Sequence, residues 1–393
     1  MSRFYIIGID DGHHRTFDGE IRAVMASHRV FSGGKRHYEL VKEQLPETHL
    51  WIDITVPLTA VFEQYAQYDE IVVFASGDPL FYGFANTVKK YLPEAEIHVY
   101  PFFNSLQVLA HRMVMPYHDM RVVSLTGRPW QEFDRALIEG CGKIGVLTDR
   151  QHTPAAIAAR MLEYGYGNYR MWVGELLGNE QERVRSMSLE EAVEADCAFP
   201  NCLILEQLAL RRRPFGIPAS DFHLLNGRSR MITKMPVRLL TLSMLDLHNR
   251  QNFWDIGFCT GSVSIEAKLQ FPHLQVTAFE IREEGAVLML QNSRKFGTPG
   301  IKAVIGDFTA VDLTTEAAPD AVFIGGHGGK MAQILTILAG KMRPGGIVVF
   351  NSVSEESLQL FRSETKKTGF RILKECCLTV EEYNPITVIK ACL

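Results

Sequence analysis

Short apolar runs alternate with segments of helical spacing along most of this chain. Each run is bounded by glycine, proline or small polar residues, and apolar residues then recur every three or four positions. Regular alternation of this kind predicts an α/β fold, with parallel strands covered by helices. A last pair of runs predicts a closing antiparallel hairpin. The predicted strands lie at residues 3–9, 30–31, 71–75, 97–100, 121–125, 143–148, 171–175, 201–206, 253–256, 275–280, 301–305, 320–324, 347–350, 371–379 and 387–393.

The stretch from 253 to 267 carries the clearest functional pattern. It predicts a strand, a turn that contains Gly257 and Gly261, and a helix. The first glycine permits a sharp bend, the second lets the backbone approach a ligand, and the helix directs its partly positive N-terminus at that ligand. We therefore expect a nucleotide-like cofactor at this turn.

Four further strand ends complete this predicted site. Glu280 ends the next strand, about 20 residues beyond the turn, where an acidic residue accepts hydrogen bonds from ribose hydroxyls. Asp307 and Phe308 follow the third strand, at a position suited to adenine contacts. His327 and Asn351 follow the fourth and fifth strands, where small and polar residues indicate the floor of a substrate cavity. An ordinary loop histidine is an equally good interpretation of His327.

The first half contains a second loop of interest. The strand at 71–75 ends at Ser76 and Gly77, and Asp78 with Pro79 predicts the N-cap and first position of a helix that continues to about residue 91. The exposed backbone of Gly77 and Asp78, at the carboxyl end of a parallel strand, is then expected to contact a cofactor.

Composition narrows the class of protein. A chain of 393 residues is expected to form two or three domains, and the arginine, proline and glycine cluster within 209–218 predicts a linker between 1–208 and 219–393. The net charge of −4 argues against a nucleic-acid partner, and no apolar run is long enough to cross a membrane. Seven cysteines without paired spacing, and two adjacent histidines, His13 and His14, without further ligands nearby, predict a cytoplasmic protein with reduced thiols and no metal site.

Several motifs of the first half occur in a fixed order. They are Ser-Gly-Asp-Pro-Leu-Phe-Tyr-Gly at 76–83, Thr148-Asp149 before Pro154, and Gly-Glu-Leu-Leu-Gly at 174–178 ahead of Glu182-Arg183-Val184. Over most of residues 1–208 this set resembles the tetrapyrrole methylase family, most closely its precorrin C5-methylating branch. The resemblance implies a two-lobed α/β domain that holds S-adenosylmethionine between its lobes.

The second half resembles the decarboxylating precorrin methyltransferase domain. The similar motifs are Ile-Thr-Lys ahead of Val-Arg within 232–238, Trp-Asp-Ile-Gly followed by Thr-Gly-Ser-Val-Ser-Ile-Glu-Ala within 254–267, and Asp-Ala-Val-Phe-Ile-Gly-Gly at 320–326. The strand order and final hairpin predict a Rossmann-like, seven-stranded, doubly wound sheet. A second S-adenosylmethionine is expected here, at Thr233, Gly257, Phe258, Cys259, Thr260, Gly261, Glu280, Asp307 and Phe308.

Together the two resemblances imply a bifunctional enzyme of cobalamin biosynthesis. Such an enzyme methylates a precorrin at ring carbons 5 and 15 and decarboxylates an acetate side chain. Because the substrate carries many carboxylates, five basic residues are candidates for binding it, although ordinary surface charge is the better interpretation of any single one. These residues are Arg128, Arg150, Lys234, Arg238 and Lys330. We also expect a homo-oligomer, and the sequence indicates no particular catalytic residue.

Two other functions stay open at this point. Both folds also host methyltransferases that act on RNA or protein, and a basic groove with stacking aromatic residues would favour RNA. The first loop, Gly8-Ile9-Asp10-Asp11-Gly12, differs from the glycine-proline-glycine turn that is usual in the family. A binding protein with one inactive half is therefore the third hypothesis.

Overall fold

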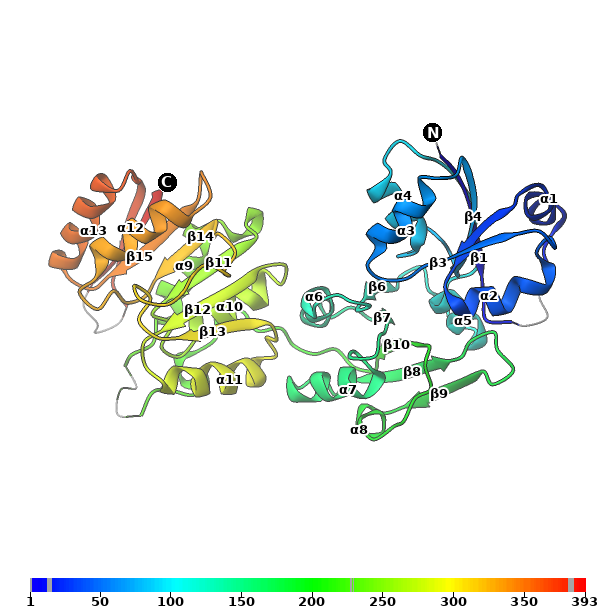
Figure 1. The fold of residues 1–393 in the computed structure, drawn as a ribbon. Coiled ribbons are helices and arrows are strands. Elements are labelled where there is room, and N and C mark those ends of the chain that lie inside the picture. The colour runs from blue at the N-terminus through cyan, green and yellow to red at the C-terminus, as the bar shows by residue number, and fades with distance from the viewer. Residues whose placement is uncertain (1, 13–15, 227, 229, 381–384) are drawn as a thin grey trace. The chain divides into compact units, whose positions relative to one another are not determined.

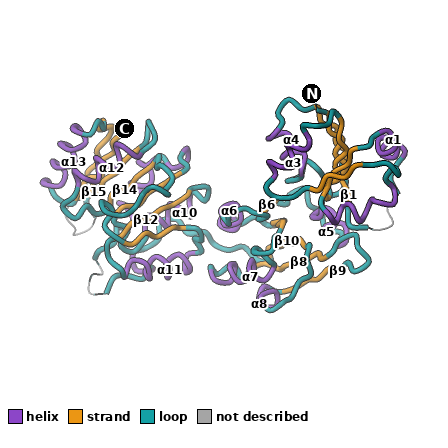
Figure 2. The backbone as a smooth tube through the Cα atoms, viewed as in Figure 1, coloured by secondary structure: helices purple, strands orange, loops and turns teal. Residues whose placement is uncertain are grey.

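Three β-sheets with helices packed against them form the protein (Figures 1 and 2). The computed structural model describes residues 2–12, 16–226, 228, 230–380 and 385–393, so His13 and His14 lie outside the described residues. Figure 2 shows strands and helices alternating along the tube, and the predicted α/β class is confirmed. Within the described ranges, no helix is both long enough and apolar enough to cross a membrane.

Two compact units make up the chain. The first comprises Met1–Arg128, Gly142–Ala159 and Tyr169–Leu208, and the second comprises Pro129–Cys141, Arg160–Asn168 and Ala209–Leu393. Two short segments of the first half therefore belong to the second compact unit, and the chain passes finally into that unit after Leu208.

The first unit begins with a sheet of five parallel strands. Its elements are β1 (Arg3–Ile9), α1 (Gly19–Ser27), β2 (Val30–Gly33), α2 (Lys35–Val41), the 3-10 helix η1 (Lys42–Gln44), β3 (Leu50–Asp53), α3 (Leu58–Tyr65), β4 (Glu70–Ser76), α4 (Phe84–Tyr91) and β5 (Glu96–Tyr100). The strand order is β3-β2-β4-β1-β5. The apolar run of β4 is uninterrupted because both of its faces are buried: Ile71 and Val73 pack into one core cluster, and Val72 and Phe74 into another.

The loop after β4 corrects one prediction. The helix α4 begins at Phe84, so Asp78 and Pro79 are not its N-cap and first position. The Asp78 carboxylate instead accepts a hydrogen bond from the Leu80 backbone N–H at 2.8 Å, which stabilises a local turn. The close backbone packing of this turn also requires Gly83, where a Cβ atom would lie 2.5 Å from the Pro79 carbonyl oxygen.

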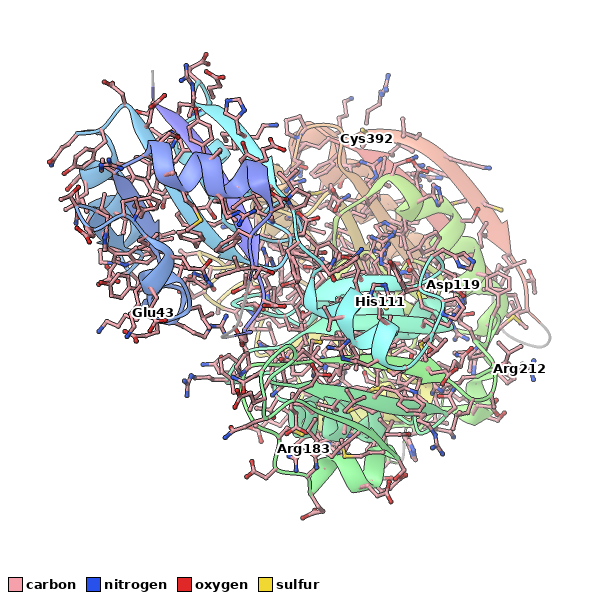
Figure 3. The ribbon with its side chains drawn as sticks, turned by 90° about the vertical axis from the view of Figure 1, so that its right-hand side faces the viewer. Glu43, His111, Asp119, Arg183, Arg212 and Cys392 are labelled. Atoms are coloured by element: carbon pink, nitrogen blue, oxygen red, sulfur yellow. The ribbon has the colours of Figure 1, made fainter. Side chains whose placement is uncertain are left out.

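A mixed sheet follows, with the strand order β6-β7-β10-β8-β9. This part of the chain contains α5 (Ser105–Arg112), β6 (Arg121–Ser124), α6 (Gln131–Glu139), β7 (Lys143–Leu147), α7 (Pro154–Glu163), β8 (Tyr169–Glu175), β9 (Arg183–Met187), α8 (Leu189–Val193) and β10 (Asn201–Gln207). Strand β9 was not predicted, because its alternate positions are Arg183 and Arg185 rather than apolar residues. Both donate to the buried carboxylate of Glu175 on β8, at 2.6 and 2.7 Å, and Arg183 is labelled in Figure 3.

The sheet of the second unit has seven strands in the order β13-β12-β11-β14-β15-β17-β16. Five are parallel, and β16 and β17 form the predicted antiparallel hairpin. Its elements are η2 (Ala219–Asp221), α9 (Met235–Leu245), η3 (Leu247–Asn249), β11 (Asn252–Ile256), α10 (Ser262–Gln270), β12 (Gln275–Glu280), α11 (Glu284–Phe296), β13 (Ile301–Ile305), β14 (Ala321–Ile324), α12 (Met331–Lys341), β15 (Ile347–Ser352), α13 (Glu355–Lys367), β16 (Arg371–Leu378) and β17 (Ile386–Cys392).

Helices cover both faces of this sheet (Figure 1). Phe253 packs with α9 and α10 in one core cluster, and the next residue, Trp254, packs with α12 and α13 in another. The chain winds outward from β11 to β12 and β13, and then returns to β14 on the other side of β11. Ligands of doubly wound sheets bind at the carboxyl ends of the strands beside such a reversal.

The predicted linker has an exposed arginine pair. Arg212, labelled in Figure 3, and Arg213 are exposed, whereas the Arg211 guanidinium lies 4.4 Å from the centre of the Tyr166 ring. The three arginines therefore do not form one continuous basic patch of free charges.

Candidate active site

A cavity of about 650 Å³ opens at the carboxyl ends of β11, β12, β13, β14 and β15 in the second unit. It brings together residues that lie far apart in the sequence and that the sequence predicted for cofactor or substrate binding. They are Thr233, Lys234, Gly257, Phe258, Cys259, Glu280, Asp307, Phe308, His327 and Asn351. Thr260 and Gly261 belong to the same turn but do not line the cavity.

The glycine turn has the backbone geometry that its sequence predicts. Gly257 and Gly261 have φ angles of +78° and +75°, in the left-handed region that glycine adopts without strain. A Cβ atom on Gly257 would lie 2.8 Å from the backbone nitrogen of Gly326, so the loops after β11 and β14 touch at this point. Cys259 also has a positive φ, of +51°, and its thiol lies 3.1 Å from the Met231 carbonyl oxygen. The turn therefore contacts the segment that precedes α9.

Glu280 is oriented by contacts within the protein. Its side chain is almost fully buried, and one carboxylate oxygen accepts a hydrogen bond from the Cys259 backbone N–H at 2.8 Å. The other oxygen accepts from the Arg282 backbone N–H at 3.1 Å and from the Arg282 guanidinium at 2.9 Å. The carboxylate is thus held beside the turn, at the end of β12, before any ligand binds.

Asp255 is a buried acid that lines the cavity and was not among the predicted site residues. One of its oxygens accepts from the Ser264 hydroxyl at 2.6 Å and from the Ser264 backbone N–H at 3.2 Å. The other oxygen has no hydrogen-bond partner among the described residues. Burial raises the pKa of Asp255 to about 7. Its position two residues before Gly257, directly after the apolar residues Phe253 and Trp254, was the signal that could have identified it.

Asp307 and Phe308 have different surroundings at the end of β13. The Asp307 carboxylate forms an ion pair with Lys330 and accepts hydrogen bonds from the backbone and side chain of Thr309, which hold its pKa at about 2. Lys330, which was predicted to bind substrate carboxylates, is therefore engaged with Asp307. Phe308 is buried, with its ring centre 5.0 Å from that of Phe279, and forms both core and cavity wall.

His327, after β14, and Asn351, at the end of β15, are polar residues that line the cavity. The Gly329 backbone N–H donates to Nδ1 of His327 at 3.2 Å, and burial lowers the pKa of His327. The Thr241 hydroxyl lies 3.0 Å from the amide nitrogen of Asn351 and 3.1 Å from its amide oxygen. Because the single hydroxyl proton is donated to the Val237 carbonyl oxygen at the shorter distance of 2.8 Å, the hydroxyl accepts from the amide nitrogen. The amide oxygen of Asn351 is thereby left as an acceptor.

Arg238, one of the candidates for binding substrate carboxylates, does not line the cavity. It is completely buried in an ion pair with Glu266. Its guanidinium also donates to the carbonyl oxygens of Ile217 and, at 2.8 Å, Thr233. Arg238 therefore fixes the segment that carries Thr233 and Lys234 along the cavity, and its own charge is not available to a ligand.

The predicted residues of the first unit lie on loops at the carboxyl ends of its strands. Gly77 has a φ of +62°, and its N–H donates to the Ile9 carbonyl oxygen at 2.7 Å. A Cβ atom on Gly8 would collide with the Gly77 carbonyl oxygen and lie 2.8 Å from the backbone nitrogen of Phe102. The loops after β1, β4 and β5 are therefore closely packed against one another.

Arg128 lies near the same group of loops. Its guanidinium is 5.1 Å from the centre of the Tyr82 ring, and it donates to the Ser124 hydroxyl at 2.8 Å. Tyr82 belongs to the loop that also contains Gly77 and Asp78. Arg150 instead lies over the Phe199 ring, 5.2 Å from its centre. Of these two arginines, only Arg128 contacts the loop that the sequence assigned to the cofactor.

Comparison with known proteins gives matches for both halves. Residues 7–193 match the family model described as tetrapyrrole (corrin/porphyrin) methylases, and residues 226–391 match the precorrin methyltransferase domain. The decarboxylating precorrin-6Y C(5,15)-methyltransferase of Sinorhizobium is 31% identical over 94% of this chain and 89% of its own length. The protein of the same name from Mycobacterium tuberculosis is 28% identical over 90% of this chain and 87% of its own length.

A solved structure is similar to part of the chain. The crystal structure of a precorrin-6Y C5,15-methyltransferase from Geobacter metallireducens is 30% identical, with a TM-score of 0.42, and the match covers 45% of this chain and 96% of that one.

Fold, cavity and domain matches together define a class of protein. A glycine turn and an acid at the end of the second strand lie together in the cavity, and both matched domains are of methyltransferase type. The class is therefore a two-domain methyltransferase. Because the similarity to the Sinorhizobium relative extends over nearly the whole of both chains, this chain belongs to the family of decarboxylating precorrin-6Y C(5,15)-methyltransferases.

Proposed function

We propose that this chain methylates a precorrin at ring carbons 5 and 15 and decarboxylates one acetate side chain, in cobalamin biosynthesis. S-adenosylmethionine is the methyl donor. The observation that carries this proposal is the cavity of the second unit, where the residues predicted for the cofactor lie beside those predicted for the substrate. Membership of the family over 94% of the chain supports it.

The two methylations are divided between two domains. Residues 1–208 form the two-lobed tetrapyrrole methylase domain, which methylates carbon 5. Residues 209–218 are the linker, and residues 219–393 form the Rossmann-like, seven-stranded domain, which methylates carbon 15 and decarboxylates the acetate. Each domain binds one S-adenosylmethionine. We expect the chain to form a homo-oligomer, which light scattering of the purified protein tests.

The chemistry of the second cavity fits S-adenosylmethionine. Glu280, already oriented by Cys259 and Arg282, is suited to accept hydrogen bonds from the ribose hydroxyls. The unpartnered oxygen of Asp255 is a buried acceptor that needs a donor or a positive charge, and the cofactor carries an ammonium group. Phe308 and the backbone near Asp307 are suited to the adenine ring.

Methyl transfer mainly requires that the methyl donor and the acceptor carbon are aligned and that water is excluded. When bound, S-adenosylmethionine supplies an electrophilic methyl group, which a nucleophilic carbon of the reduced macrocycle attacks. Holding the two reactants in line is worth on the order of 7–11 kcal/mol of the barrier, and no general base is then required. The apolar wall of the cavity, which includes Val237, Val263 and Ile334, favours loss of the charged acetate carboxylate because it solvates that charge poorly.

Mass spectrometry tests the proposal. The purified protein is incubated with metal-free precorrin-6Y and S-adenosylmethionine, and the molecular masses of the products are measured. Two added methyl groups with loss of carbon dioxide are expected. A single added methyl group would mean that only one of the two domains is active. An unchanged tetrapyrrole would contradict the proposal.

A further inference from the structure

The two halves of the sheet present different groups to the cavity. The half over β11, β12 and β13 presents the carboxyl groups of Asp255, Glu280 and Asp307, which we assign to the cofactor side. The half over β14 and β15 presents His327 and Asn351. Because a methyl acceptor must lie beside the donor, the β14–β15 half is the substrate side.

His327 is held as a neutral imidazole with one N–H group that the protein does not use. Nδ1 accepts the hydrogen bond from Gly329, so the proton of the neutral ring is on Nε2. The ring meets Phe350 edge to face, with 5.9 Å between ring centres, and burial keeps the pKa of His327 below its usual value. Among the described residues, Nε2 has no hydrogen-bond partner.

Of the four cations that line the cavity in the described part of the chain, two are already paired on the cofactor side. Lys330 follows His327 on the same loop, but its ammonium group forms the ion pair with Asp307. Arg282 is paired with Glu280. To pair with a substrate carboxylate beside His327, Lys330 would have to break its ion pair with Asp307, and Arg282 its ion pair with Glu280. An anionic group that enters the β14–β15 half therefore meets His327 as a donor that is still available.

We propose that His327 binds a carboxylate of the tetrapyrrole through Nε2–H, as a neutral hydrogen-bond donor. This inference rests on the proposed function, because it takes a precorrin as the substrate of the second domain. Loss of a hydrogen bond to a charged acceptor weakens binding about 10- to 100-fold. Since the donor is uncharged, the bond persists above neutral pH, where an imidazolium would have lost its proton.

The substitutions His327→Phe and His327→Gln separate the hydrogen bond from the packing of the ring. Phe can keep the edge-to-face contact with Phe350 but has no donor, whereas the Gln amide can supply an N–H group. In the full chain with saturating S-adenosylmethionine, we expect His327→Phe to raise the KM of carbon-15 methylation about 10- to 100-fold, with kcat within a few-fold of wild type. His327→Gln is expected to recover most of that loss.

The pH dependence of KM tests the charge state of the donor. Other ionisable groups line the same cavity and titrate in both proteins, so the quantity compared is the ratio of KM in His327→Phe to KM in the wild type. These groups are Arg230, Lys234, Asp255, Cys259, Glu280, Arg282, Asp307 and Lys330. The ratio is expected to stay constant from about pH 6.5 to about pH 8.5. A ratio that falls towards one as the pH rises would assign the effect to an imidazolium and overturn the neutral-donor proposal.

Internal controls distinguish the remaining outcomes. Carbon-5 methylation by the first domain and binding of S-adenosylhomocysteine to the second report that each variant is folded, and the exposed His248→Gln is expected to match the wild type. An unchanged KM in His327→Phe, or an equal loss in His327→Gln, overturns the inference alone. If the wild type methylates no precorrin, the proposed function fails and the inference fails with it.

Discussion

The two predicted cofactor sites are built from different parts of the polypeptide. In the first unit, backbone atoms meet at glycines, and the loop side chains Leu80, Tyr82 and Phe103 are about half exposed. In the second unit, side chains line a cavity, and Asp255, Glu280 and Phe308 are buried in its wall. The first site therefore depends on the space between loops, and the second on the orientation of individual side chains.

This difference explains how each site responds to mutation. A glycine between two backbone segments accepts no side chain, so a substitution there must move a loop. Truncation of a buried carboxylate moves the backbone little. The donors that it leaves unpaired cost some stability, and the ligand that it binds loses an acceptor. We therefore expect mutations in the first site to affect folding most, and mutations in the second to affect affinity most.

Gly8→Ala is expected to have the largest effect. Its Cβ atom would collide with the Gly77 carbonyl oxygen and approach the Phe102 nitrogen, and both are backbone atoms that cannot rotate away. We expect a loss of about 3 kcal/mol or more in the stability of the first unit, measured by denaturant unfolding, together with loss of its cofactor site in calorimetric titration.

A matched glycine provides the control for this prediction. A Cβ atom on Gly19, at the start of α1, would meet nothing within 4 Å, so Gly19→Ala should leave stability and cofactor stoichiometry unchanged. Two cofactor sites and wild-type stability in Gly8→Ala would contradict the close packing of the loops after β1, β4 and β5.

Glu280→Ala is expected to act on the second site alone. Removal of a carboxylate that accepts hydrogen bonds from ribose weakens binding there about 10- to 100-fold, while affinity at the first site stays the same. Calorimetric titration with S-adenosylhomocysteine measures both sites in one experiment. The exposed Glu284→Ala, in the first turn of α11, is the control for the change in charge. Equal weakening of both sites would refute the assignment.

The elements of the fold were largely predictable because their apolar runs are buried. The strand at β4 and the helix α12 follow directly from such patterns. The pattern of apolar residues did not predict the elements whose structure depends on polar contacts. Strand β9 carries arginines that bind the buried Glu175, and the turn at Asp78 uses a side-chain hydrogen bond where a helix start was predicted.

The candidate site was predictable to the extent that it lies at strand ends. Glu280, His327 and Asn351 converge on one cavity because parallel strands bring their carboxyl ends to the same edge. Pairing between side chains was not predictable. Lys330 was expected to be available to substrate but binds Asp307, and Arg238 was expected at the surface but is buried with Glu266. These pairs join residues that no local spacing relates.

Arg128→Ala is expected to have the smallest effect. It tests whether side chains contribute to cofactor affinity at the first site. The contact between the Arg128 guanidinium and the Tyr82 ring is of the cation–π type, which is worth about 0.5–1 kcal/mol at an exposed site and corresponds to roughly a two- to fivefold change in affinity. Because Tyr82 belongs to the Gly77–Asp78 loop, calorimetric titration should show this small loss at the first site and none at the second.

Arg128→Lys keeps the charge but not the planar stacking, so its affinity should lie between those of the wild type and Arg128→Ala. A loss in Arg128→Ala as large as that in Glu280→Ala would mean that Arg128 binds the ligand directly, and the first site would then depend on side chains as the second does.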